Sequence, residues 1–391
     1  MIARLIFRFL WERPWQFALA VALCALGLAS AISIVWLQSL LETHARRQAQ
    51  GIDIVVGAQG SALQNVLAAV YYLDVPNGNI RLAEVDALRA NPLVAKAIPI
   101  ALGDSVAGAR IVGTTPEFVS FYGATLASGE LPAAPMDAVI GAAVAARTGL
   151  KVGDSFAGAH GLGDVGVEHD SHPYRVSGLL NPTGRVIDQT VVTLLESVWL
   201  VHESHAASTE KEATFALIQV KSPIAMATLP RLINQKPGLQ AAVPAMESAR
   251  LLISFDWVAL IVKAFATVLI VAAMASLLGA LLQALARQEP ELALLRAMGA
   301  SRRQLSALML GESLVLVAVS AVLAGALSGA GVWALKTFAL PGLVVDAQQG
   351  FLFWLAGLLL AIVMAIVATI PVLWRSASVD VAAQLSSRKL L

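Results

Sequence analysis

The chain has 391 residues, of which 58% are hydrophobic and only 14% are charged, and its mean hydropathy is +0.74. Soluble domains carry about 25% charged residues, so this composition indicates a membrane protein. The net charge of +1 gives no strong field that would attract nucleic acid, and no such partner is expected. The only cysteine, Cys24, lies inside an apolar run, so no intramolecular disulfide can hold the fold together.

Four segments of the sequence are long and apolar enough to cross a membrane, which takes roughly 20 residues of helix. We expect these spans at residues 15–41, 257–286, 305–336 and 351–374. Tryptophans lie close to several of their ends, where an amphipathic indole prefers the membrane interface. The sequence therefore predicts four transmembrane helices.

The first of these segments has a second interpretation, as a cleaved signal peptide. Arg4, Arg8 and Arg13 precede it, and the residues at 29–31 resemble a cleavage site. Its apolar region, however, is about twice as long as a typical signal core, which favours a retained anchor.

The orientation follows from the basic residues, because short segments rich in Lys and Arg stay in the cytoplasm. These residues gather in the amphipathic N-terminal segment 1–14, in the turn 287–304 and in the tail 375–391. The turn 337–350 has Asp346 as its only charge and is expected outside, as is the long segment 42–256. We therefore expect a bacterial inner-membrane protein with both termini in the cytoplasm and one large periplasmic domain.

The segment 42–256 alternates short β-branched runs with helical patterns and glycine or proline breaks, which is typical of a mixed α+β domain. Strands are expected around 52–56, 138–140 and 174–176. A helix is expected over 61–72, with a core-facing stripe formed by Leu63, Val66, Leu67 and Val70.

Three glycines in this domain mark short motifs: Gly113 in Ile-Val-Gly-Thr-Thr-Pro-Glu-Phe, Gly141 in Val-Ile-Gly, and Gly153 in Lys-Val-Gly-Asp. Taken alone, each glycine predicts only a tight turn with positive φ. Their order and spacing, with Ala-Ser-Gly-Glu at 127–130, resemble the extracytoplasmic domain of the MacB/FtsX/LolC family of ABC transporter permeases. The resemblance covers nearly the whole chain. It implies four transmembrane helices plus an extracytoplasmic domain with a porter-like part and an inserted smaller part.

The turn 287–304, called the coupling turn below, reads as helix, break and helix. Pro290 suits a first helical turn, Gly299 suits the position after a helix, and Ser301 with Gln304 forms a capping box that opens the third span. Physically this could be no more than a basic helix at the membrane interface.

The same turn resembles the family signature at the helix that docks on the ATPase subunit, although Pro290 departs from the commoner pattern. The resemblance implies ATPase-coupling residues at Glu291, Leu292, Leu295, Arg296, Met298, Gly299, Arg302 and Arg303.

The sequence has no Gly-x-x-x-x-Gly-Lys-Ser/Thr motif that could cradle nucleotide phosphates. ATP and Mg²⁺ are therefore expected to act through a separate P-loop ATPase subunit, and this chain is not expected to be an enzyme. The resemblance also implies a second permease copy, most simply in a homodimer. Gly325 and Gly329 have the small-xxx-small spacing that allows helices to approach closely, and we expect a dimer contact there.

A group of histidines in the extracytoplasmic domain raises the question of a metal. Imidazole and nearby carboxylates suit zinc, but the spacing matches no closed structural site, and solvated loop histidines explain the group equally well. The candidate ligands are His160, His169, His172, His202 and His205.

Two classes of function fit the sequence. In the first, the chain is a permease that transmits ATP-driven motion to its periplasmic domain. Its cargo would be a lipoprotein, lipid, peptide or drug, and the transport could be linked to a metal. In the second, it is a membrane-anchored receptor or regulator that recruits a periplasmic partner, such as a cell-wall hydrolase or a metal-binding protein. Three spans after the domain exceed what anchoring alone requires.

Overall fold

The computed structural model describes residues 14–159, 172–202, 210–254, 301–339 and 345–377, together with parts of 257–282. The chain divides into two compact units. Among the described residues, the helical unit contains those up to Leu41 and those from 257 onward, and the sheet unit contains Glu42–Ser254. One long helix, α2 (Pro14–Ala49), contributes residues to both.

The sheet unit is built on a mixed sheet in the order β12-β1-β11-β3-β4-β9-β6-β8-β5, with β7 also paired to β8. Most neighbours are antiparallel, whereas β4 with β9 and β6 with β8 run parallel. The strands are β1 (Ile54–Ala58), β3 (Val94–Val106), β4 (Ala109–Thr114), β5 (Leu126–Gly129), β6 (Asp137–Ile140), β7 (Ser155–Phe156), β8 (Tyr174–Leu180), β9 (Thr190–Leu194), β11 (Phe215–Val220) and β12 (Leu239–Ala242). A separate two-stranded pair joins β2 (Ile80–Arg81) to β10 (Glu212–Ala213). These strands confirm the predicted mixed α+β domain.

The strand β3 connects two groups of strands because its two halves have different partners. Its first half pairs with β11 and its second half pairs with β4. The first group is completed by β1 and β12, while all strands of the second group lie between β3 and β11 in the sequence. The second group is therefore nested inside the first.

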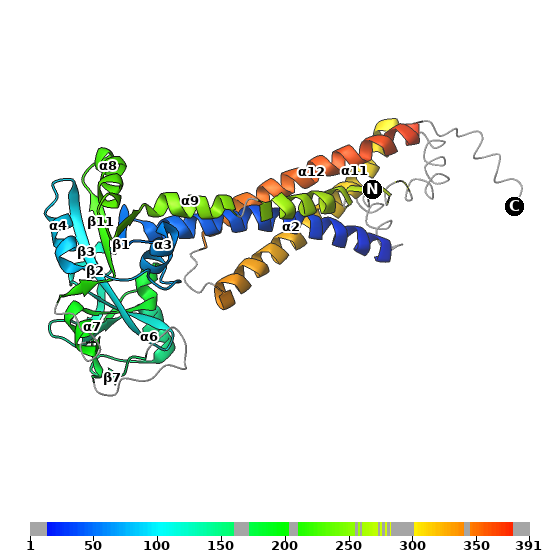
Figure 1. Ribbon diagram of the computed structural model, residues 1–391. Coiled ribbons are helices and arrows are strands. Elements are labelled where there is room, and N and C mark those ends of the chain that lie inside the picture. Colours follow the sequence, from blue (N-terminus) through cyan, green and yellow to red (C-terminus); the bar gives the residue numbers. More distant parts are fainter. Residues whose placement is uncertain are drawn as a thin grey trace, which may run out of the picture. The chain divides into compact units, whose positions relative to one another are not determined.

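Both faces of the first group are buried, as the alternation of its side chains shows. Val55 and Leu217 point to one apolar core, and their neighbours Ile54 and Ile218 point to another. Helices cover these faces, with α3 on the first core and α4 and α8 on the second (Figure 1). The helices of the sheet unit are α3 (Ala62–Val70), α4 (Leu82–Arg89), α5 (Glu117–Phe121), α6 (Ala142–Thr148), the 3-10 turn η1 (Val186–Gln189), α7 (Leu195–His202), α8 (Pro223–Asn234) and α9 (Pro244–Ser254).

The predicted stripe of the 61–72 helix is only partly correct. Val66 and Val70 are buried in α3, but Leu63 and Leu67 are only half-buried. The buried positions also include Asn65, Ala68 and Ala69, because small side chains face the sheet where α3 approaches it closely.

The three motif glycines have different structural roles, and the predicted positive φ is found for only one of them. Gly153 has φ +97° and is a turn glycine as predicted. Gly113 and Gly141 do not have positive φ; a Cβ at Gly113 would lie 2.5 Å from Val198, and one at Gly141 would lie 2.3 Å from the Ile187 carbonyl oxygen. These two glycines are needed because other groups pack directly against the backbone.

The helical unit contains α2, α11 (Arg302–Ala334) with its π-helical extension η3 (Leu335–Ala339), and α12 (Ala347–Ala377). Within the described residues, three helices are long and apolar enough to span a membrane, at Phe17–Ala49, Leu310–Phe338 and Ala347–Pro371. The predicted second span lies partly outside the described residues. Its segment Leu260–Ala272 is an apolar helix shorter than a span, so the fourth span stays a prediction.

Replacing Gly141 by alanine should destabilise the sheet unit by more than about 3 kcal/mol, because the new methyl group meets the backbone carbonyls of Ile187 and Asp188, which cannot move aside cheaply. Gly149→Ala is the matched control: Gly149 has φ +73° but open space around it, so its cost is about 1 kcal/mol. Urea unfolding of the purified chain in detergent, followed by circular dichroism, measures both. Equal stability of the two variants would contradict this account.

Candidate functional site

The described part of the coupling turn confirms its predicted end. The Ser301 side chain accepts from the Gln304 backbone N–H at 3.4 Å, and the Ser301 N–H donates to the Gln304 carbonyl oxygen Oε1 at 2.8 Å. This capping box fixes where α11 begins, with Arg302 and Arg303 in its first turn. The other predicted coupling residues, Glu291, Leu292, Leu295, Arg296, Met298 and Gly299, lie outside the described residues.

Serine side chains connect α11 to α2 inside the helical unit. Ser320 Oγ lies 3.3 Å from the Val21 carbonyl oxygen and 2.9 Å from the Leu316 carbonyl oxygen of its own helix. About two turns further along α11, Ser328 Oγ donates to the Ala29 carbonyl oxygen at 3.2 Å and accepts from Ser33 Oγ at 3.1 Å. Hydrogen bonds of this kind hold helices together in an apolar environment, where no water competes for them.

The helix α12 packs on α11 in the opposite direction. The Trp354 indole Nε1 donates to the Ala321 carbonyl oxygen at 2.9 Å, and Thr369 Oγ1 donates to Ser313 Oγ at 3.2 Å. Because Trp354 pairs with a later position of α11 than Thr369 does, the two helices run antiparallel.

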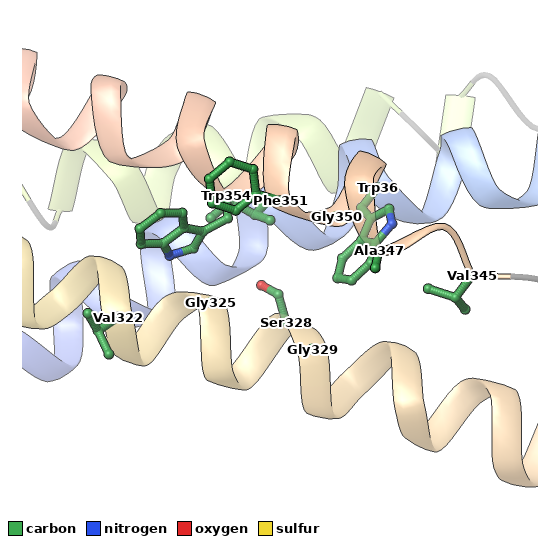
Figure 2. A pocket seen from close by; sticks show the side chains of 11 residues that line it. Trp36, Val322, Gly325, Ser328, Gly329, Val345, Ala347, Gly350, Phe351 and Trp354 are labelled. Carbon is green, nitrogen blue, oxygen red and sulfur yellow. The ribbon is translucent and has the colours of Figure 1, made fainter.

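A cavity of about 550 Å³ lies between these three helices, lined almost entirely by apolar side chains. Figure 2 shows Trp354 of α12 and Trp36 of α2 at either side of it, with Ser328 of α11 between them. Gly325 faces the Trp354 ring, so that a Cβ there would lie 2.5 Å from it, whereas Gly329 has open space. Gly325 therefore serves a contact within the chain, and the dimer contact at Gly325 and Gly329 stays a prediction.

The last turns of α2 are bonded to the body of the sheet unit by Gln48 and Arg185. Gln48 is 4% exposed, and its Oε1 accepts from the Val186 backbone N–H at 2.6 Å. The Arg185 guanidinium donates to the backbone carbonyl oxygens of Gln48 and Gln50, and to that of Tyr122 at 3.0 Å. A cation at a helix C-terminus satisfies carbonyls that have no partner within the helix and interacts favourably with the helix dipole. We call Gln48, Arg185 and Tyr122 the stalk clamp.

The loop that carries Arg185 is itself rigid. The Asp188 carboxylate accepts from the backbone N–H groups of Thr183 and Gly184 at 3.0 and 2.7 Å, and from the Thr183 hydroxyl at 2.7 Å. Gly184, with φ +70°, provides the turn. The guanidinium is thereby held 4.4 Å from the centre of the Tyr122 ring in a cation–π contact.

Burial sets the charge states of the stalk clamp. It lowers the pKa of Arg185, which nevertheless stays protonated at neutral pH, and the nearby Tyr122 acts in the opposite direction. Burial also raises the pKa of Tyr122 above its ordinary value. The clamp therefore keeps one positive charge and a neutral phenol throughout the physiological range.

Tyr71 connects the end of α2 to α9. Its hydroxyl lies 3.3 Å from the Ala45 carbonyl oxygen of α2 and 3.0 Å from Ser248 Oγ of α9. The helix that enters the sheet unit and the helix that ends it are thus joined by one side chain at the end of α3.

The histidine group gives no metal site within the residues that the structure describes. There, no three histidine, cysteine, aspartate or glutamate side chains come close enough to share an ion. His160, His169 and His205 lie outside this part of the chain; His172 precedes β8 and His202 ends α7. Zinc binding stays a prediction.

Sequence reasoning missed the stalk clamp and the interhelical serines. The signal for the first was the Asn-Pro-Thr-Gly-Arg segment at 181–185, a typical turn followed by Asp188, which predicts a rigid loop but not its partner. The signal for the second was the spacing of Ser320 and Ser328, which places two hydroxyls on one face of an apolar helix.

Comparison with protein families agrees with this architecture. The model of the MacB-like periplasmic core domain matches residues 17–236, and that of the FtsX-like permease C-terminal domain matches residues 263–381. Because the first match alone covers more than half of the 391 residues, the chain belongs to the MacB/FtsX-type permease family. Members of this family are membrane subunits of ABC transporters, and the chain is such a subunit with an extracytoplasmic domain.

Solved structures that are similar to part of this chain have distant sequences. The periplasmic region of MacB from Actinobacillus actinomycetemcomitans is 12% identical, with 52% of this chain and 95% of that chain covered and a TM-score of 0.36. The extracellular domain of the ABC-type transporter YknZ from Gram-positive bacteria is 11% identical, with 48% and 98% covered and a TM-score of 0.31. A comparison with curated proteins gives no significant match. The family assignment rests on the two family models.

Replacing Arg185 by lysine should lower the free energy of unfolding by about 1.5–3 kcal/mol, because an ammonium group cannot reach the α2 carbonyls and the Tyr122 carbonyl together. Arg175→Lys, on the exposed face of β8, is the matched control and should change little. Denaturant unfolding in detergent measures the difference. If both variants are as stable as the parent, the clamp does not hold α2.

Proposed function

We propose that this chain transmits ATP-driven motion from a separate ATPase to its extracytoplasmic domain, and that α2 is the element that carries it. The observation that supports this most is the continuity of α2 from Pro14 to Ala49, with its last turns bonded to the sheet unit through the stalk clamp. A helix is stiff along its axis, so a displacement at one end reappears at the other.

The proposed route begins at the coupling turn. The capping box at Ser301 fixes the last residues of this turn at the start of α11, and in this proposal a push on the turn moves α11. The serine contacts then connect α11 to α2, and the clamp connects α2 to the sheet. Cargo moved by the outer domain, whether lipoprotein, lipid, peptide or drug, needs no path through the bilayer in this scheme.

The direction of the helices supports the predicted topology. Val21 pairs with Ser320 and Ala29 with Ser328, so α2 and α11 run parallel. Two parallel spans require the chain to cross back once between them, and the predicted span at 257–286 is the segment that does so. We therefore place the coupling turn and both termini in the cytoplasm of a bacterial cell and the sheet unit in the periplasm.

The alternative is a membrane-anchored receptor whose sheet unit recruits a periplasmic protein. Such a protein needs no rigid connection from its helices to its outer domain, and the bonded end of α2 favours the transporter. Purification of the tagged chain from its native membrane separates the two proposals. A transporter brings down a P-loop ATPase at equal stoichiometry, whereas a receptor brings down only a periplasmic protein.

The substitution Leu295→Asp should abolish stimulation of the ATPase by the permease, because it places a charge at an apolar position of the coupling turn that would be desolvated on docking to the ATPase. Leu295→Met keeps the volume and the apolar character and should retain stimulation. ATP hydrolysis by the co-purified complex in lipid nanodiscs is the readout. Full stimulation by the Leu295→Asp variant would refute coupling through this turn.

A further inference from the structure

From the serine contacts in the helical unit, we infer that α2 and α11 are locked in register and move as one two-helix rod. This inference rests on the proposed function, for which it identifies Ser33, Ser320 and Ser328 as positioning residues. It excludes a cycle in which α11 slides or rotates against α2.

The register is defined at two levels of the helix pair. The bonded positions Val21 and Ser320 differ by 299 in sequence, and so do Ala29 and Ser328. The same offset eight residues apart means that both helices advance together over more than two turns. A shift by a single residue would move one helix by about 1.5 Å and turn its side chains by about 100°, which breaks both contacts at once.

The hydroxyls of these serines are buried, and Ser320 also bonds to the Leu316 carbonyl oxygen of its own helix at 2.9 Å. Ser320 is 0% exposed and Ser328 is 2% exposed, so neither hydroxyl is bonded to water or lipid. Ser33 supplies the second hydroxyl at Ser328, which makes a chain from Ser33 through Ser328 to the Ala29 carbonyl oxygen. If the helices slid apart, the Ser328 hydroxyl would lose both of these α2 partners inside an apolar core.

Small side chains at the same interface allow the backbones to approach closely enough for such bonds. Ala20 and Ala29 of α2 share a buried cluster with Ala324 of α11, which is 0% exposed. Close approach of this kind makes the two surfaces interlock rather than glide. Hydroxyl bonds and packing therefore enforce the same register.

A reversible crosslink tests whether the helices move together. The Oγ atoms of Ser33 and Ser328 are 3.1 Å apart, so cysteines at these positions are close enough to form a disulfide after a small adjustment. The variant is Ser33→Cys with Ser328→Cys, with Cys24→Ala to remove the native thiol. The full-length permease is oxidised in native membranes and then purified with its ATPase, and each single-cysteine variant is treated identically as a control.

Two results are expected. The disulfide should form to the same extent with and without ATP, since the register does not change during the cycle. The oxidised complex should keep its ATPase stimulation within about twofold of its own reduced form, because a bond between groups that already move together adds no strain. Failure of the crosslink to form, dependence of its yield on ATP, or loss of stimulation that dithiothreitol restores would each overturn the inference.

These results can be told apart from failure of the proposed function. If the unmodified permease neither co-purifies with an ATPase nor stimulates one, the proposed function fails. The crosslink yield in membranes still decides the register of α2 and α11 in that case, because it needs no partner.

Discussion

The proposed transmission depends on α2 being a single helix from Pro14 to Ala49. Pro14–Ala49 contains no interior proline, and its last turn carries Gln48 of the stalk clamp. Continuity is therefore the constraint that the serine contacts, the clamp and the Tyr71 bridge all serve.

Different chemistry secures α2 at its two ends, in accordance with the surroundings. In the helical unit, where apolar surface gives little drive for association, hydroxyls and small side chains hold α2 against α11. In the sheet unit, a buried glutamine and an arginine whose charge is shared among backbone carbonyls bond the end of the same helix. Arg185 also satisfies backbone carbonyls at the end of the helix that would otherwise need water as a hydrogen-bond donor.

Features that depend on neighbouring residues could be predicted from the sequence. The capping box at Ser301 and Gln304 was predictable because both partners lie within one turn, and three of the four expected spans were predictable because length and composition suffice. The mixed α+β domain followed from short alternating patterns, and the family from the order of the glycine motifs.

Features that depend on distant residues could not be predicted. Gln48 and Val186 are 138 positions apart, and nothing local to either indicates the other. Gly141 was misjudged for the same reason: sequence shows that a glycine is present, but not that the Ile187 carbonyl packs against it. The exposure of Leu63 and Leu67 likewise depends on how closely α3 approaches the sheet.

The most direct test of this account is the distance between spin labels at the two ends of α2. Trp15 is 86% exposed and the Arg46 side chain is 79% exposed, so cysteines there can be labelled in a Cys24→Ala background. A continuous helix places their backbones about 46 Å apart, because each residue rises about 1.5 Å. The account predicts one narrow distribution near this distance, unchanged by ATP, when labelled chains are diluted with unlabelled ones. A broad distribution, or a shorter distance that appears with ATP, would show a hinge in α2 and contradict the account.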